Sequence, residues 1–188
     1  MEGYHPTGNA NPLNAFTPSG ALIKAGLVHA GQEMSYYLNS AGSLETIVYP
    51  DHNQGYGRVQ MNSIIDFGAT YSLVVWGTAN SSAFPGKDIS FTSVGQDFVV
   101  VLNTTSQLAA IRDFKVTMAY VDTPIGLGDA SLSNDLDLTV EYEGDTLYPI
   151  WTTPSADGQN TVEQISISSP TANSTIKVLF SLTIGLLF

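Results

Sequence analysis

Residues 134–140 read Asn-Asp-Leu-Asp-Leu-Thr-Val, and this alternation of polar and apolar side chains predicts a β-strand. Because successive side chains of a strand point to opposite faces, the two leucines share one face while Asp135 and Asp137 share the other. At about 3.3 Å per residue, the two aspartates begin roughly 7 Å apart. Two carboxylates at this spacing repel each other when unpaired, and they can hold one hard cation from opposite sides.

The charge pattern around this strand favours an ion as the partner of its carboxylates. No Lys or Arg occurs between positions 115 and 177, although that stretch holds nine Asp and Glu residues. A preceding hydrophobic strand ends in Asp122, which adds another oxygen ligand of the kind that Ca²⁺ prefers. The sequence therefore predicts a Ca²⁺ site formed by Asp122, Asn134, Asp135 and Asp137.

A structural interpretation of the same residues stays open. Asp122 and Asn134 also suit the capping of turns around residues 126–133, and the other carboxylates would then face water. Further along the chain, Glu163 and Asn160 fit hydrogen bonds to a loop better than they fit a chemical role.

The length and composition of the chain limit the classes of protein to which it can belong. The 188 residues suffice for one domain, or for one domain and part of another. A formal charge of −11, with only six Lys and Arg, argues against a nucleic-acid partner, which requires clustered basic side chains. The absence of cysteine excludes disulfides, thiolate metal sites and a cysteine nucleophile.

The ends of the chain bear on localisation. Residues 1–6 have neither the basic nor the apolar region of a signal peptide, so we expect either a non-secreted protein or a true start further upstream. The apolar residues 178–188 are too few to span a bilayer as a helix, and we expect a buried strand and no membrane partner. N-x-S/T triplets at Asn80, Asn103 and Asn173 indicate a secreted or endomembrane-lumenal protein.

One helix is expected in the N-terminal third. Thr17 suits its cap, Pro18 its first position and Gly31 the stop after it, and a short helical turn is expected at residues 61–65. Residues 35–57 are polar and show no periodic pattern. The apolar residues that share one helix face, and that have no domain of their own to cover them, are Leu22, Ile23, Leu27 and Ala30.

The remaining sequence predicts a mainly β fold. Short alternating or apolar runs separated by Gly, Pro and Asn turns indicate an antiparallel β-sandwich of the jelly-roll type. One helix with loops cannot enclose a core, so we expect residues 1–66 to belong to a different domain from residues 67–188. The predicted strands are residues 71–76, 89–91, 98–102, 114–122, 136–142, 147–151, 162–167 and 176–184.

Five segments, taken in order, resemble the C-terminal part of subtilisin-like serine endopeptidases. They are FTPSGALIKA at 16–25, GYGRV at 55–59, the strand at 115–122, NDLDLTV at 134–140 and DGQNTVEQI at 157–165. The similar subgroup carries a β-sandwich after its catalytic domain. The resemblance implies that residues 1–66 are a short α-containing remnant of the α/β subtilase catalytic domain and that residues 67–188 are the jelly roll. Calcium sites are known in this sandwich class, whereas Thr161 departs from the usual Asn-Asn-Val-Glu pattern of the family.

The family's catalytic segments do not occur in this chain. These are an Asp-Ser/Thr-Gly, a His-Gly-Thr-His and a Gly-Thr-Ser-Met-Ala segment, which supply the triad in that family. The resemblance therefore implies a fragment that is inactive by itself and supports a catalytic domain missing upstream of Met1. Peptide-bond hydrolysis, and a protein substrate, would belong to the intact enzyme alone.

An alternative from another class is a non-catalytic adhesion module that holds calcium or glycan. No triad can be built on His5, His29 or His52, and His29 is expected to carry positive charge at the end of the helix. Aromatic residues could form a sugar platform, but most lie in strand-like runs and are expected in the core. They are Tyr36, Tyr37, Tyr49, Tyr56, Trp76, Tyr142, Tyr148 and Trp151.

Overall fold

The computed structural model of the chain describes residues 17–47, 49, 53–65, 73–75, 91–104, 113–123, 132–149 and 155–185. Of the strand predicted at 71–76, residues 73–75 are described and are not in a strand; of that predicted at 89–91, only residue 91 is described, and it is not in a strand either. His5, His52, Trp76, Asn80 and Trp151 lie outside the described residues.

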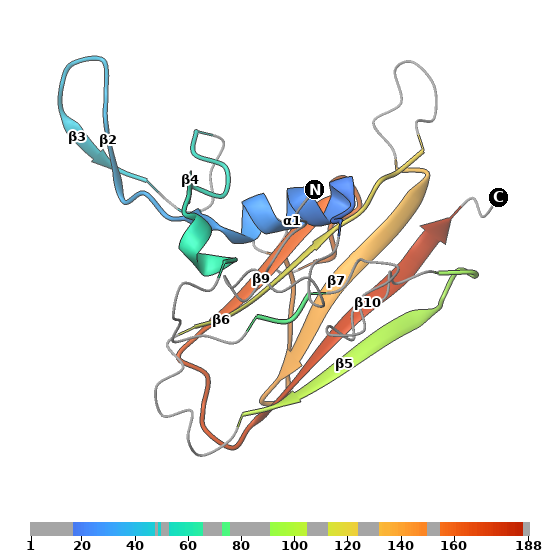
Figure 1. Ribbon diagram of the computed structural model, residues 1–188. Coiled ribbons are helices and arrows are strands. Elements are labelled where there is room, and N and C mark those ends of the chain that lie inside the picture. The colour runs from blue at the N-terminus through green and yellow to red at the C-terminus, as the bar shows by residue number, and fades with distance from the viewer. Residues whose placement is uncertain are drawn as a thin grey trace.

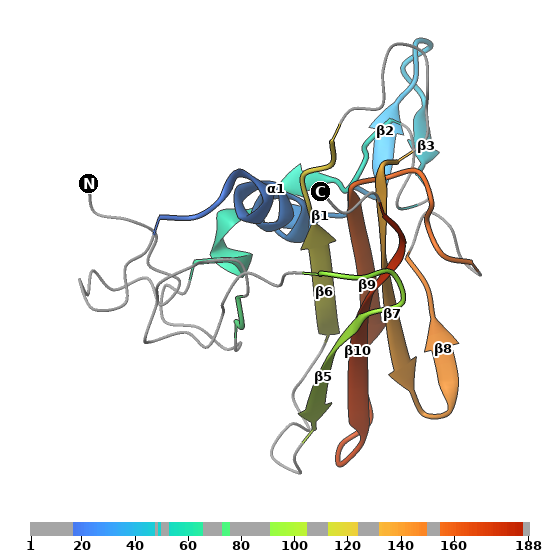
Figure 2. The same ribbon diagram turned by 90° about the vertical axis from the view of Figure 1, so that its right-hand side faces the viewer.

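Two antiparallel sheets face each other, which confirms the mainly β sandwich (Figures 1 and 2). The larger sheet has the order β5-β10-β7-β8, and the smaller consists of β6 and β9. The larger sheet is formed by β5 (Asp97–Asn103), β10 (Thr175–Gly185), β7 (Asn134–Tyr142) and β8 (Asp145–Leu147). The smaller sheet is formed by β6 (Asp113–Ala119) and β9 (Val162–Ser168).

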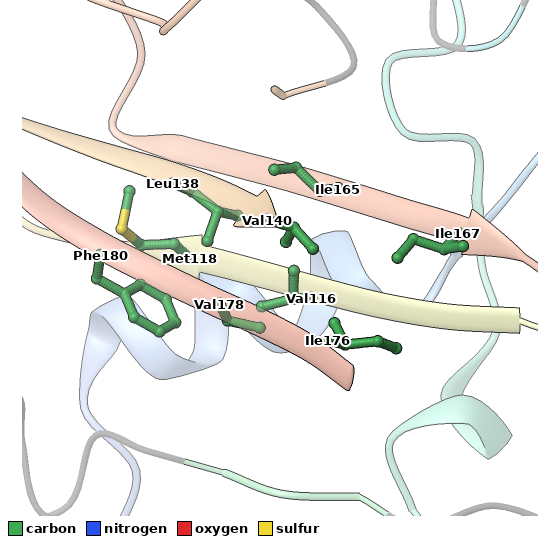
Figure 3. Close-up of a cluster of buried hydrophobic side chains, with 9 residues drawn as sticks. All are labelled: Val116, Met118, Leu138, Val140, Ile165, Ile167, Ile176, Val178 and Phe180. Atoms are coloured by element: carbon green, nitrogen blue, oxygen red, sulfur yellow. The ribbon is translucent and has the colours of Figure 1, made fainter. Parts of the chain in front are cut away.

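The hydrophobic core lies between the sheets and follows the period-2 pattern of the strands. On the inner face of the larger sheet, apolar residues of β7 lie beside apolar residues of β10, as in the pairs Leu138 with Phe180 and Val140 with Val178. Phe98 of β5 continues the first row, and its ring centroid lies 5.9 Å from that of Phe180. Figure 3 shows the buried cluster, which consists of Val116, Met118, Leu138, Val140, Ile165, Ile167, Ile176, Val178 and Phe180.

The strand predicted at residues 147–151 is misplaced, because β8 spans Asp145–Leu147 and the next two residues are not in a strand. Glu143 and Gly144, with φ of 51° and 91°, form the turn between β7 and β8. A two-residue turn with positive φ at both central positions reverses the chain at once. Strand pairing therefore resumes immediately after the glycine, two residues before the predicted start.

The predicted helix exists as α1 (Gly20–His29), but its cap is Ser19 and not Thr17. The Ser19 hydroxyl accepts a hydrogen bond from the backbone N–H of Leu22 at 3.1 Å, so Pro18 lies outside the helix. The expected turn near residue 61 is the short 3₁₀-helix η1 (Met61–Ser63). Figure 1 shows α1 lying across β6 and β9, outside the sandwich.

The sequence of residues 35–57 indicated a segment without a regular pattern. The structure instead contains a hairpin there, formed by β2 (Tyr36–Leu38) and β3 (Leu44–Thr46). This hairpin extends away from the sandwich in both Figure 1 and Figure 2. Its loop is ordered by Asn39, whose side-chain oxygen accepts hydrogen bonds from the N–H groups of Ala41 and Ser43 at 2.9 and 3.0 Å. Every strand residue of the hairpin is exposed, so it lacks the burial alternation that identifies strands in a sequence.

A second small sheet, β1 (Gly31–Gln32) with β4 (Arg58–Val59), depends on two glycines. A Cβ atom at Gly31 would lie 2.0 Å from the carbonyl oxygen of Tyr56, and one at Gly57 would lie 2.1 Å from that of Gln32. Gly31 therefore permits a close backbone approach and is not the left-handed helix stop that the sequence suggested. Gly57 also has a φ of 85°, which L side chains rarely adopt.

We predict that Gly57→Ala lowers the free energy of unfolding by more than the roughly 1–2 kcal/mol that left-handed φ costs alone, because the backbone must also move. Gly42→Ala is the matched control, since Gly42 has a φ of 78° with no atom within 4 Å of the added Cβ. Urea denaturation of both variants measures the difference. Equal losses would show that the contact with Gln32 contributes nothing.

Candidate functional site

Asp122 accepts hydrogen bonds from Ser133 and Asn134, which agrees with the structural alternative at these positions, while residues 124–131 lie outside the described part of the chain. One carboxylate oxygen of Asp122 accepts from the N–H of Ser133 at 2.6 Å, and the other accepts from the backbone and side-chain nitrogens of Asn134 at 2.9 and 3.0 Å. Burial alone would raise the pKa of Asp122, but the hydrogen bonds from Ser133, Asn134 and Thr123 together lower it. The oxygens of Asp122 are thus already engaged with protein donors.

Asp135 and Asp137 do not face water, which contradicts the other half of that alternative. Their exposed fractions are 8% and 7%, although both lie near the end of β7. Thr183 of β10 donates a hydrogen bond to Oδ2 of Asp137. The Oδ1 atoms of both aspartates are buried without a hydrogen-bond partner among the described residues.

Glu163 joins these aspartates from the opposite sheet and is fully buried. Its Oε2 accepts the backbone N–H of Leu138 at 2.7 Å, so it bonds a strand and not the loop that the sequence had suggested. Within the described residues β8 pairs only with residues 140–142 of β7, which leaves the N–H of Leu138 without a strand partner on that side. The Tyr120 hydroxyl lies 3.4 Å from the N–H of Leu136 in the same way.

Asp157 forms the fourth member of the cluster and is buried in the loop before β9. Its Oδ1 accepts from the N–H groups of Gln159 and Asn160 at 3.0 and 3.2 Å, and its Oδ2 accepts from Asn160 Nδ2 at 2.7 Å. Asn160 thus hydrogen-bonds within a loop, as expected. A Cβ atom at Gly158 would lie 3.4 Å from Oδ2 of Asp135, which places this loop against the β7 aspartates.

Electrostatic repulsion couples the four acids, which we call the carboxylate cluster: Asp135, Asp137, Asp157 and Glu163. Burial is the main cause that raises the pKa of Glu163 to about 9; the hydrogen bond from the Leu138 N–H opposes it, and the charge of each of the three aspartates adds a smaller increase. Burial, followed by the charges of Asp137, Asp157 and Asp122, also raises the pKa of Asp135. A proton on Glu163 therefore relieves part of the repulsion.

Basic side chains of the described residues have partners elsewhere. Lys177 pairs with Glu141 at 2.9 Å, and Lys24 donates to the Thr161 hydroxyl at 2.6 Å. Lys115 lies 3.2 Å from the carbonyl oxygen of Gly31. Arg58 lies 3.4 Å from the side-chain oxygen of Gln60. Among the described residues, no basic side chain is left to neutralise the negative charge of the carboxylate cluster. A proton or an ion from solvent must therefore neutralise it.

The four residues predicted to bind Ca²⁺ divide into two groups in the structure. Asp122 and Asn134 cap the turn, whereas Asp135 and Asp137 belong to the carboxylate cluster. In the described ranges, no three Asp, Glu or His side chains are placed so that they could hold a metal ion together. The unpartnered oxygens are Asp135 Oδ1, Asp137 Oδ1 and Glu163 Oε1, and they are the atoms available to an added cation.

Sequence reasoning missed the part played by Asp157 and Glu163, although signals for both exist. Alternation along residues 162–167 places Glu163 on the same face as Ile165 and Ile167, and therefore toward the core. Asp157 precedes Gly158 in a typical Asx-turn sequence. Neither signal indicates that both residues approach β7, because that contact joins two sheets.

His29 belongs to a separate polar network between α1 and the smaller sheet. Its Nδ1 lies 3.0 Å from the Thr117 hydroxyl, and Gln164 donates to that hydroxyl at 2.9 Å and to the Val28 carbonyl at 3.3 Å. Burial and the nearby charge of Lys115 lower the pKa of His29 to about 4. The expectation of a charged histidine at the helix end is therefore wrong near neutral pH, and the ammonium group of Lys115 lies there instead, 3.4 Å from the His29 carbonyl.

The aromatic residues only partly follow the expected core location. Tyr142 packs against the hydrophobic core, and Tyr49 donates to Gln164 at 3.2 Å. Tyr36 and Tyr37 are exposed on the β2–β3 hairpin, contrary to expectation. They lie in succession on one strand and so point to opposite faces, an arrangement that does not give a single stacking platform.

Comparison with protein-family models and with curated proteins finds no match for this chain. No helix of the described residues has the length and apolar character needed to cross a membrane.

We predict that the cluster makes stability fall as pH rises. Because Glu163 keeps its proton to about pH 9 when folded, but has an ordinary pKa of 4.5 when unfolded, its contribution is complete below pH 4.5 and is lost toward pH 9. In chelator, the free energy of unfolding should decline between these values by at most about 1.4 kcal/mol per pH unit. Urea denaturation across this range measures the slope.

Glu163→Gln should flatten this slope, because the amide oxygen still accepts the Leu138 N–H but cannot ionise. Glu141→Gln is the control, since it alters an exposed carboxylate of the larger sheet and should leave the slope unchanged. Equal slopes for wild type and Glu163→Gln would exclude a protonated Glu163.

Proposed function

We propose that this chain is a non-catalytic support module of a secreted subtilisin-like serine endopeptidase. The observation that carries the proposal is the apolar stripe that α1 leaves exposed, although polar contacts and partly buried apolar residues hold the helix against the sandwich. Ile23 and Leu27 lie one turn apart with exposed fractions of 51% and 44%. The sequence resemblance assigns the same helix to the end of a catalytic domain, which would lie over this stripe.

Polar contacts between α1 and the sandwich help to fix the orientation of the helix. They consist of hydrogen bonds from Lys24 to Thr161 and from Gln164 to the Val28 carbonyl, and of the contact between His29 and Thr117. A surface helix normally turns its apolar stripe toward the core it covers. Here Leu22 and Val28 are partly buried beside the polar contacts, whereas Ile23 and Leu27 stay exposed and are left for another body.

In the intact enzyme the reaction would be peptide hydrolysis through an acyl-enzyme, with a serine nucleophile and a histidine base supplied by the catalytic domain. His29 is unsuited to that role, because it is half-buried and its Nδ1 lies against Thr117. The chain contributes a rigid platform: the sandwich holds α1, and α1 presents Ile23 and Leu27 to the catalytic domain.

Two measurements test this proposal. The transcript upstream of the Met1 codon should encode, in frame and within a few dozen codons, a Gly-Thr-Ser-Met-Ala segment, and an in-frame stop codon directly before Met1 would contradict the proposal. The purified chain should not react with a fluorophosphonate probe or cleave casein. Labelling of a specific serine would show that the chain is itself catalytic.

The apolar stripe can be probed in the chain itself. Ile23→Ser with Leu27→Ser should reduce the fluorescence of bound anilinonaphthalene sulfonate, because these side chains supply exposed apolar surface. Val99→Ser with Val101→Ser, on the outer face of the larger sheet, is the matched control at similar exposure. A larger decrease in the control pair would place the adhesive surface on the sandwich and not on α1.

We further propose that the module binds Ca²⁺ at the carboxylate cluster. Asp135 Oδ1, Asp137 Oδ1 and Glu163 Oε1 are buried carboxylate oxygens without partners among the described residues, and Ca²⁺ prefers oxygen ligands. They are not placed to hold one ion together in this structure, so binding would require the three side chains to move closer to one another. Asp122 and Asn134 would act only by fixing the turn next to the site. The ion would replace the proton of Glu163 as the compensating charge.

Millimolar Ca²⁺ should raise the melting temperature at low ionic strength by several degrees, since an ion at a hundred times its dissociation constant adds about 2.7 kcal/mol. Mg²⁺ should do less, because it requires a smaller octahedral shell. Asp137→Asn and Asp135→Asn should diminish this response. Glu141→Gln is the control: it removes an exposed carboxylate that pairs with Lys177 and should leave the response to calcium unchanged. Superimposable curves in Ca²⁺ and chelator would exclude the site.

A further inference from the structure

The turn between β9 and β10 carries an acceptor sequence that neither the support role nor the carboxylate cluster uses. Asn173-Ser174-Thr175 is an N-x-T triplet, and all three residues lie in the described part of the chain. Asn173 is exposed, has a φ of 59°, and its side chain forms no hydrogen bond with other described residues.

The backbone on both sides of Asn173 is anchored to neighbouring strands. The N–H of Ser174 donates to the buried Thr104 hydroxyl at 2.7 Å, and the N–H of Thr104 donates to the Ser174 carbonyl at 2.9 Å. The N–H of Thr171 donates to the Tyr142 hydroxyl at 2.7 Å. The turn is therefore held by groups other than the Asn173 side chain, and a substituent on that side chain displaces none of these contacts.

Turn geometry by itself explains an asparagine at this position, because Asn tolerates left-handed φ better than most residues. Glycine would satisfy the same geometry. What geometry does not supply is the coincidence of an exposed, unengaged amide with a hydroxyl two residues later, which is the pattern that N-glycosylation requires.

We propose that Asn173 is an N-glycosylation site of this protein. The co-substrate is a lipid-pyrophosphate-linked oligosaccharide. Nδ2 of Asn173 forms a bond to the anomeric carbon of the first sugar and loses one proton to the transferase, while the bond from that carbon to the pyrophosphate oxygen breaks and the lipid pyrophosphate leaves with the electron pair. The glycan then extends from the β9–β10 turn at one end of the sandwich.

This assignment concerns Asn173 and not the other two triplets. Asn103 lies opposite Thr175 at the end of β5, and its side-chain oxygen accepts a hydrogen bond from the Thr175 hydroxyl at 3.1 Å. The side-chain oxygen of Asn103 is therefore bound in the folded sheet, whereas the side chain of Asn173 forms no hydrogen bond with other described residues. Asn80, and Thr105 of the Asn103 triplet, lie outside the described residues.

The test uses the full chain directed into the secretory pathway of yeast by an appended signal peptide. Peptide N-glycosidase should release one oligosaccharide from Asn173 and convert that residue to Asp, which peptide mass spectrometry detects. Asn173→Gly should abolish this product, because glycine keeps the left-handed turn but has no amide. Thr175→Ala should abolish it too, whereas Thr175→Ser should retain it.

Glycosylation of Asn173 does not depend on proteolytic activity. The glycosylation proposal can therefore fail while the proposed support role holds, and the support role can fail while Asn173 is glycosylated. Unmodified Asn173 in secreted, folded chain would overturn the proposal. So would a glycan at Asn173 that persists in Thr175→Ala.

Discussion

The hydrogen bond from the Leu138 N–H to the Glu163 carboxyl is the interaction on which the arrangement of this sandwich depends. It ties the larger sheet to the smaller at the place where β8 no longer covers β7. An unsatisfied N–H there would cost about 1–3 kcal/mol, so a side-chain acceptor is needed in the core. The acceptor is an acid beside Asp135, Asp137 and Asp157, and the same group that completes the edge of β7 therefore creates a charge that must be neutralised.

A second polar interface decides how the N-terminal third sits on the sandwich. Gln164 is fully buried on the outer side of β9, and it bonds Thr117, Tyr49 and the Val28 carbonyl. Because side chains alternate along β9, Glu163 points into the sandwich and Gln164 points toward α1. These two successive polar residues therefore bind β7 on one side of the smaller sheet and α1 on the other. The support role proposed for the chain follows from this division, because the helix is fixed by polar groups and its apolar stripe stays available.

Sequence reasoning identified the strands in which buried and exposed residues alternate. It missed the elements that are stabilised by turns or by single hydrogen bonds. Alternation located β5, β7, β9 and β10 and placed Leu136 and Leu138 on one face of β7, which the structure shows to be the core face. It missed the exposed β2–β3 hairpin, which is ordered by Asn39, and it placed the strand after Gly144 too late. The paired aspartates of β7 were found from their spacing, but their burial was not, because it is imposed by Thr183, the Asp157 loop and the opposite sheet. Asp122 looked like a ligand because a carboxylate that caps a turn and one that binds a cation have the same sequence pattern.

The protonation state of Glu163 tests the central claim that the cluster requires a neutralising proton or cation. Carbon NMR of the side-chain carboxyl, titrated from pH 4 to 10 in chelator, measures it directly. The account predicts a midpoint near pH 9 in chelator and a midpoint displaced to lower pH in saturating Ca²⁺. A midpoint near the ordinary value of 4.5 in chelator would contradict it, because Glu163 would then be ionised beside three aspartates without a compensating charge from the described residues.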